Sequence, residues 1–266
     1  MRAIHFKNVY KSFGERVVLR DFTMEVQAGE TKVVLGEGGS GKTTLLRMVL
    51  GLVQPDSGQV FVEDQEITDL SEPELMNIRK GIGIVFQEGA LFDSLTVGEN
   101  VAYQMREDAT YTEEYIGNTV RRLLGFIGLE NTIDQFPSEL SGGMLRRVGI
   151  ARALVGNPPI LLYDSPTAGL DPITSRTICE LMMKLRDLEG VSSIVVTHDL
   201  TVVTTLASEF AELQPDQEVR FRTHGDESVD LLNTRFVMLK DGTIVFEGTE
   251  KTLKTADDPY IQDFLT

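Results

Sequence analysis

The chain has 266 residues, enough for one large domain with a substantial core, and its hydrophobic (41%) and charged (25%) fractions are typical of a soluble globular protein. Its formal net charge of −16 argues against general nucleic-acid binding, which needs Lys and Arg to neutralise phosphates. One cysteine, Cys179, excludes an internal disulfide, and its amphipathic helical surroundings predict a buried thiol. No run of 18 apolar residues occurs, so a cytoplasmic protein is expected.

The N-terminal third is predicted to be rich in strands. Alternation of apolar and polar residues predicts antiparallel strands within 3–13 and 20–27. A Gly-rich turn then opens a helix predicted over 42–52. Short apolar segments predict further strands at 31–36, 59–64 and 81–86.

The middle of the chain is predicted to be helical. Ser71 with Glu74, and Thr96 with Glu99, have the spacing of a capping box and predict two helix starts. Helical patterns follow at 113–129 and 142–156, and the whole of roughly 88–158 is poor in strand signals. This block is therefore predicted to be an inserted α-helical subdomain.

Strands return in the last part of the chain, at 159–164 and 192–198, around a helix at 174–188. A hairpin closed at Asp241-Gly242 is expected near the end. Alternation of helices with short apolar strands predicts a single α/β domain (1–266) with a mainly parallel sheet and an N-terminal antiparallel β part. Its core would comprise about 1–87 and 159–266.

The turn "GEGGSGKTT" has the phosphate-loop pattern and the required context, a preceding strand and a following helix. Its glycines allow backbone N–H groups to converge on phosphate oxygens at a helix N-terminus. Lys42 is expected to reach the β- and γ-phosphates and Thr43 to ligate magnesium, whereas a simple connecting turn is the weaker alternative. The nucleotide-binding candidates are Gly36, Glu37, Gly38, Gly39, Ser40, Gly41, Lys42, Thr43 and Thr44.

Asp164 ends the apolar strand "PILLYD", so its carboxylate is expected at the carboxyl edge of the sheet, where ligands bind in such folds. There it could hold the magnesium ion directly or through water. A capping Asp at a strand–loop turn is the alternative.

A second Gly-rich helix start follows in "ELSGGMLRR", where Ser141, Gly142 and Gly143 precede a basic helix. It predicts a second anion-binding helix N-terminus in the same chain. Since one nucleotide has little use for two such sites from one subunit, a head-to-tail pair of subunits is the natural arrangement. A Gly-rich N-cap without a ligand is the alternative.

These segments, with Gln87 in "VFQEGALF", "LLYDSPTAGLD" and "VTHD", occur in an order that resembles the ATP-binding-cassette (ABC) ATPases over nearly the whole chain. The resemblance implies a RecA-like P-loop NTPase fold and an ATP-sandwich homodimer that binds ATP and Mg²⁺ and drives a membrane permease. It assigns Gln87 to the metal and the attacking water, with Thr43 and Asp164 as the other metal residues. It assigns the signature residues Ser141, Gly142, Gly143 and Met144 to the partner subunit's ATP.

The same resemblance implies that His198 contacts the γ-phosphate, that Phe13 stacks on adenine and that Asp171 communicates across the dimer. From the residues alone, His198 could be a structural turn residue and Phe13 a core residue. A narrower similarity, in "FQEGALFDSLTVGENVAY", Met144 and "DPITS", is to the ATPases of Mce-associated lipid transporters of the Mla type. It implies phospholipid transport, a place on the cytoplasmic face of the inner membrane, a permease and an Mce lipid-binding protein as partners.

Two residues depart from this pattern. Ser165 stands where ABC ATPases usually carry the Glu that polarises the attacking water, and Glu88 stands where the Mla type usually has Ser. Glu88 is therefore a candidate for the missing carboxylate, with Ser165 beside the reacting phosphate. The alternatives are a solvated Glu88 with a degenerate or slow site, and an engineered change that blocks hydrolysis.

An acidic insertion separates "VTHD" from the last hairpin. Residues 208–234 carry seven acids and only two arginines, and "EVRFRT" predicts a short strand within them. A partner surface and a solvated decoration are both open. Two rivals to a transporter subunit remain: a soluble ABC protein acting on nucleic acid, and a nucleotide-gated assembly module with very slow catalysis.

Overall fold

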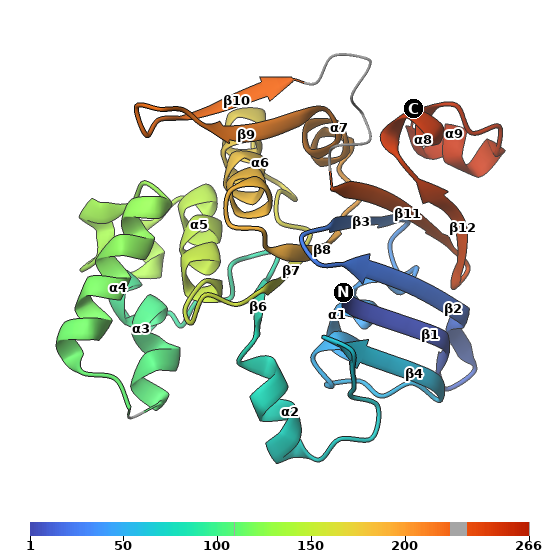
Figure 1. Cartoon of the computed structure of the whole chain (residues 1–266), viewed down its shortest axis with the longest axis horizontal. Helices are drawn as coiled ribbons and strands as arrows, with labels where there is room; N and C mark the ends of the chain where they lie inside the picture. The colour runs from blue at the N-terminus through green and yellow to red at the C-terminus, as the bar shows by residue number, and fades with distance from the viewer. Residues whose placement is uncertain (109, 224–232, 266) are drawn as a thin grey trace.

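A six-stranded sheet forms the centre of the computed structural model, which describes residues 1–108, 110–223 and 233–265 (Figure 1). The strand order is β12-β11-β3-β8-β7-β6, and every neighbouring pair except β12 with β11 is parallel. This confirms the predicted α/β class. The strands are β3 (Thr31–Gly36), β6 (Ile82–Val85), β7 (Ile160–Asp164), β8 (Ser192–Val196), β11 (Thr234–Lys240) and β12 (Thr243–Gly248).

The predicted antiparallel strands form a second sheet with the order β2-β1-β4-β5. It contains β1 (Arg2–Phe13), β2 (Arg16–Gln27), β4 (Ser57–Val62) and β5 (Gln65–Glu66). Helix α1 (Lys42–Val49) packs in the same hydrophobic cluster as this sheet and one face of the central sheet. It ends before the predicted residue 52, because Gly51 adopts a left-handed φ of 64° that an α-helix cannot continue.

The other face of the central sheet is covered by helices. These helices and this face of the sheet form a second hydrophobic cluster. Val33 and Leu35 of β3 point into it, whereas Val34 between them points into the cluster that contains α1, as the two-residue period of a strand requires. Helix α6 (Pro172–Asp187) supplies Cys179 to this second cluster, where burial raises the pKa of its thiol to about 12. The expected buried thiol is therefore confirmed.

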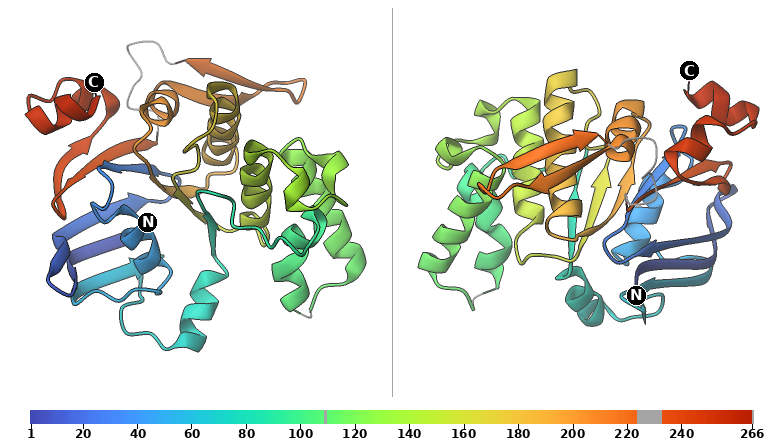
Figure 2. Two further views of the ribbon diagram at one scale, coloured as in Figure 1. Left: turned by 180° about the vertical axis from the view of Figure 1, so that it is seen from behind. Right: turned by 45° about the horizontal axis from the view of Figure 1, so that its top comes forward.

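The predicted helical block lies to one side of the sheets (green in Figures 1 and 2). Both expected capping boxes are present: one at the start of α2 (Glu72–Arg79), which precedes the block, and one at the start of α3 (Val97–Glu107), the first helix of the block. Apart from residue 109, which the structure does not describe, positions 88–158 contain helices and turns but no strand. The remaining elements of the block are α4 (Glu113–Phe126), α5 (Gly142–Ala153) and two short 3₁₀ helices, Glu130–Thr132 and Pro137–Glu139.

The insertion begins with a strand that sequence patterns did not predict. After α7 (Leu200–Ser208), β9 (Glu209–Leu213) pairs antiparallel with β10 (Val219–Thr223), which is the predicted strand. The guanidinium of Arg186, only 5% exposed, donates to the carbonyl of Glu209 at 2.8 Å, and Asp187 accepts from the amide of Ala211 at 2.8 Å. The first strand of the insertion is therefore fixed to α6 by hydrogen bonds and belongs to the folded core.

Three of the seven acids of the insertion, Asp226, Glu227 and Asp230, lie outside the described residues. The C-terminal hairpin is closed at Asp241-Gly242 as predicted, with left-handed φ angles at both residues. The chain ends in α8 (Glu250–Lys254) and α9 (Pro259–Leu265). Among the described helices, none combines the length and the hydropathy needed to cross a membrane.

Candidate nucleotide-binding site

The candidate site lies where four neighbouring parallel strands end. Since β3, β8, β7 and β6 run in the same direction, the segments after them meet at one edge of the sheet. These segments are the phosphate loop, His198, the Asp164-Ser165 pair and Gln87. They line one pocket, whose lining residues are Phe13, Arg16, Val18, Gly38, Gly39, Gly41, Lys42, Thr43, Thr44, Gln87, Asp164, Ser165 and His198.

Hydrogen bonds join Lys42 to the backbone of the phosphate loop. The Lys42 ammonium donates to the carbonyl oxygens of Gly36 at 2.6 Å and Glu37 at 2.8 Å, which holds it inside the loop. Burial lowers the pKa of Lys42, and the carboxylate of Asp164 partly opposes this change. Gly41 caps α1 with a left-handed φ of 103°, and a side chain there would approach Val18 to 2.9 Å. Lys42, Thr43 and Thr44 of the first turn of α1 line the pocket, and the amides of a helix N-terminus are anion donors.

A pair of oxygen ligands lies next to this loop. The Thr43 hydroxyl donates to a carboxylate oxygen of Asp164 at 3.0 Å, although the two residues are 121 positions apart in the chain. Gln87, whose amide oxygen is a further hard ligand, lines the same pocket. Hydroxyl, carboxylate and amide oxygens beside a phosphate site are what Mg²⁺ selects, so these residues fit the predicted metal site. A magnesium ion there would neutralise developing charge on a bound polyphosphate.

Ser165 is held beside Asp164 by its backbone. It adopts a left-handed φ of 48°, and its amide donates to the carbonyl of Val196 on β8 at 2.8 Å. Two residues after Ser165, the Thr167 hydroxyl donates to the carboxylate of Asp199 at 2.6 Å, and this hydrogen bond joins the Ser165 loop to the loop that carries His198. Among the described residues that line the pocket, Asp164 contributes the one carboxylate.

An aromatic and a cation lie at the mouth of the pocket. Phe13 ends β1 and is exposed, so its ring is available to a ligand and is not part of the core. Arg16 was not predicted as a site residue, yet its guanidinium donates to the carbonyl of Gly39 at 2.8 Å. The register pairs Arg16 with Phe13 across a two-residue hairpin turn. That turn, at Gly14-Glu15, is the sequence signal that could have identified it.

The predicted signature residues lie outside this pocket. Ser141 caps α5 by accepting from the amide of Met144, and both Ser141 and Gly142 are exposed. A side chain at Gly143 would collide with Thr174 at 2.1 Å, so this glycine is also required by the contact between α5 and α6. Asp171 caps α6 by accepting hydrogen bonds from the Thr174 hydroxyl and from the amides of Thr174 and Ile173, and these bonds lower its pKa.

Glu88 also lies outside the pocket, although it follows Gln87 directly. Its exposed side chain lines a separate hollow together with Gly142 and Arg146 at the start of α5. In this subunit, Glu88 therefore lies beside the start of the signature helix and is not among the residues that line the phosphate-loop pocket. The hypothesis that Glu88 replaces the usual catalytic Glu stays a prediction.

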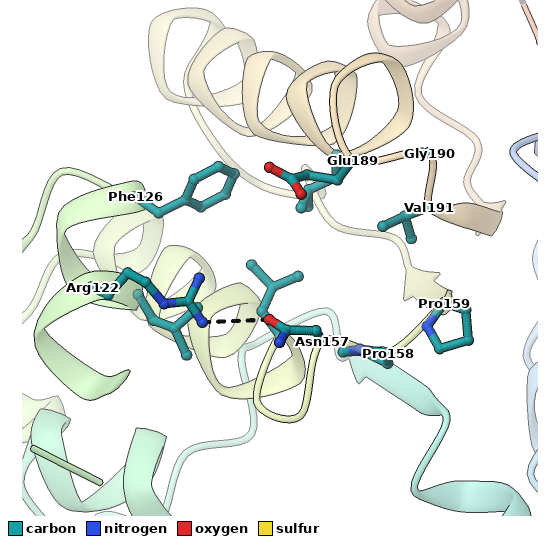
Figure 3. A pocket seen from close by; sticks show the side chains of 11 residues that line it. Arg122, Phe126, Asn157, Pro158, Pro159, Glu189, Gly190 and Val191 are labelled. Atoms are coloured by element: carbon teal, nitrogen blue, oxygen red, sulfur yellow. Dashed lines mark hydrogen bonds between the residues drawn. The ribbon is translucent and has the colours of Figure 1, made fainter. Parts of the chain in front are cut away.

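A separate cavity lies at the opposite edge of the sheet (Figure 3). Arg122 of α4 donates to the side chain of Asn157 at 3.4 Å there, and Glu189 lies across from it. Pro159 and Val191, which immediately precede β7 and β8, place this cavity at the amino ends of those strands. None of the predicted site residues lines it.

A phosphate loop, a strand-end acid and a glutamine in one pocket define a nucleotide-binding protein of the P-loop class. The family model described as "ABC transporter" matches residues 19–168. The chain belongs to the ABC transporter family. It is the ATP-binding ATPase part of such a transporter, as the motif resemblance implied.

The names of similar proteins agree with this assignment but give different transported substrates. The chain is 34% identical over 263 residues to "Probable ribonucleotide transport ATP-binding protein mkl" of Mycobacterium leprae, covering 99% of this chain and 68% of the relative. It is 35% identical over 239 residues to "Intermembrane phospholipid transport system ATP-binding protein MlaF" of Haemophilus influenzae, covering 90% of each. The ATP-binding cassette MJ0796, solved as a dimer in a post-hydrolysis state with ADP and Pi, is 32% identical with a TM-score of 0.76 and covers 92% of this chain and 98% of its own.

Proposed function

We propose that this chain is the ATPase subunit of a phospholipid transporter of the Mla or Mce-associated type. It acts as a homodimer on the cytoplasmic face of the inner membrane, where it binds permease subunits and works with an Mce lipid-binding protein. ATP with Mg²⁺ is bound in the pocket of the phosphate loop. The observation that carries the proposed dimer is the separation of this pocket from the exposed signature helix, since each subunit would then supply one half of each site.

The head-to-tail dimer follows from that separation. Ser141 and Gly142 present the amides of an α-helix N-terminus to solvent, and such a terminus attracts anions. The subunit's own phosphate loop is already served by the start of α1. Each signature helix is then free to complete the partner's pocket by contacting the γ-phosphate. Binding of ATP and magnesium should accordingly favour the dimer.

A groove beside the Gln87 segment suits a helix of the permease. Phe86, Phe92 and Tyr103 line it and are 40%, 44% and 40% exposed, and the rings of Phe92 and Tyr103 lie 4.7 Å apart. Exposed aromatic side chains that cluster in a hollow are typical of protein interfaces. The segment that carries Phe86 and Phe92 into the groove also carries Gln87 into the nucleotide pocket. The segment 86–92 would therefore connect a partner helix in the groove to the bound nucleotide.

The cargo is inferred from similarity. The phospholipid-transport relative matches at 35% identity and covers 90% of each chain, whereas the mycobacterial relative named for ribonucleotide transport extends well beyond this chain. The longest segment that resembles the Mla type, residues 86–103, carries Gln87 of the nucleotide pocket and Phe86, Phe92 and Tyr103 of the groove. Both observations favour phospholipid over nucleotide as cargo.

An assembly module that turns ATP over very slowly is the second candidate, and Ser165 favours it. Serine does not accept a proton at neutral pH, and the pocket offers Asp164 as its one described carboxylate. Both candidates bind ATP in the same pocket. They differ in whether transport requires hydrolysis of that ATP.

The test starts with co-purification of the chain with its permease from native membranes, followed by reconstitution into vesicles of phosphatidylethanolamine and phosphatidylglycerol. We expect Mg-ATP to drive the movement of a fluorescent phospholipid between the membrane and an Mce acceptor, with phosphate released in parallel. Phosphate release with ribonucleotide uptake and no lipid movement would contradict the cargo. Lipid movement with ATP bound but no phosphate released would support the assembly module.

A further inference from the structure

Arg146 of α5 lies at the junction of three functional segments. Its side chain is 8% exposed, and its guanidinium donates to the carbonyl of Ala168 and, at 3.4 Å, to that of Gly142. Ala168 belongs to the loop between Ser165 and Asp171, and Gly142 follows the signature Ser141. The third guanidinium nitrogen, Nε, is buried and has no hydrogen-bond partner among the described residues.

The third segment is the one that carries Gln87. Glu88 and Arg146 line the same hollow, and the carboxylate of Glu88 opposes the lowering of the Arg146 pKa by burial. A buried guanidinium with one unpaired donor gains from a nearby carboxylate, because both the charge and the donor are then satisfied. Glu88 is exposed, so its side chain is not fixed by packing.

We propose that Glu88 and Arg146 are positioning residues that link the two nucleotide sites of the dimer within one subunit. Gln87 contacts the subunit's own nucleotide, and a shift of Gln87 moves Glu88 relative to Arg146. Arg146 in turn fixes the loop before Asp171 and the first turn of α5, which is presented to the partner's nucleotide. This inference rests on the proposed head-to-tail dimer.

The experiment separates binding at one site from formation of the dimer. Nucleotide affinity is measured with a fluorescent ATP analogue at low protein concentration, and dimer formation by sedimentation velocity with magnesium and the β,γ-imido analogue of ATP. The variants are Glu88→Gln, Arg146→Met and the double variant. Asp93→Asn is the matched control, because Asp93 lines the same hollow and loses the same charge but does not influence the pKa of Arg146.

We expect both single variants to keep the wild-type affinity for the analogue and to weaken nucleotide-induced dimerisation by about tenfold, a typical coupling between residues of one interacting network. The double variant should be no weaker than either single variant, Arg146→Lys should recover part of the loss, and Asp93→Asn should match the wild type. The link would be overturned if the losses of dimerisation in Glu88→Gln and Arg146→Met were additive in the double variant, or if Glu88→Gln had no effect on dimerisation. A wild-type chain that does not dimerise with nucleotide would overturn the proposed dimer and the link with it.

Discussion

Replacing Lys42 with alanine should weaken ATP binding by about 100-fold or more while leaving the fold intact. The ammonium is held at the carbonyls of Gly36 and Glu37, inside the loop where phosphate oxygens would bind. A charge-assisted hydrogen bond contributes about 1.5–3 kcal/mol, and each 1.4 kcal/mol is tenfold in affinity, so loss of two such bonds gives this magnitude. Titration calorimetry with ATP and thermal unfolding of the two proteins provide the measurement.

Lys80→Ala is the matched control for this prediction. Lys80 follows α2, its side chain is 65% exposed, and it lies outside the pocket. The same charge is removed, so an effect of net charge alone would weaken ATP binding equally in both variants. Unchanged affinity in Lys42→Ala would remove the basis of the site assignment.

Replacing Ser165 with glutamate should raise turnover by about 100-fold, since a positioned general base contributes typically 10²–10⁴-fold. Ser165 lines the pocket beside Asp164, and its left-handed backbone is equally strained by serine and by glutamate. Phosphate release by the permease complex at saturating Mg-ATP checks the rate. Ser165→Gln, which has the size of glutamate but no basic carboxylate, should stay at the wild-type rate.

The same assay decides the role of Glu88. If Glu88 supplied the catalytic carboxylate, Glu88→Gln would lower turnover by about 100-fold, and Ser165→Glu would be silent alone but would restore rate in the double variant. The position of Glu88 in the hollow beside Arg146 favours the other outcome, in which Glu88→Gln weakens the dimer and Ser165→Glu does not restore it. A silent Ser165→Glu would contradict our account of the pocket.

Features that depend on neighbours in the chain were predictable from sequence. The capping residues Ser71 and Thr96 and the Asp241-Gly242 turn act within a few residues, so their patterns are visible locally. The pocket was predictable because parallel strands deliver their following loops to one edge of the sheet.

Two features that depend on particular long-range contacts were not predictable. Strand β9 continues directly from α7 without a turn signal, and it is held by Arg186 and Asp187, more than twenty positions earlier in the chain. The hollow that Glu88 lines is likewise formed in part by Arg146, 58 residues later. Neither contact leaves a pattern in the local sequence.

Mixing two inactive subunits tests most directly whether the chain works as a head-to-tail ATPase dimer. Lys42→Ala removes the phosphate loop's cation, and Ser141→Arg blocks the signature helix, so each variant alone should release no phosphate. Mixed in equal amounts, they should recover about a quarter of the wild-type rate, because half of the dimers are mixed and each holds one complete site of two. No recovery on mixing, or full activity of Ser141→Arg alone, would contradict the account.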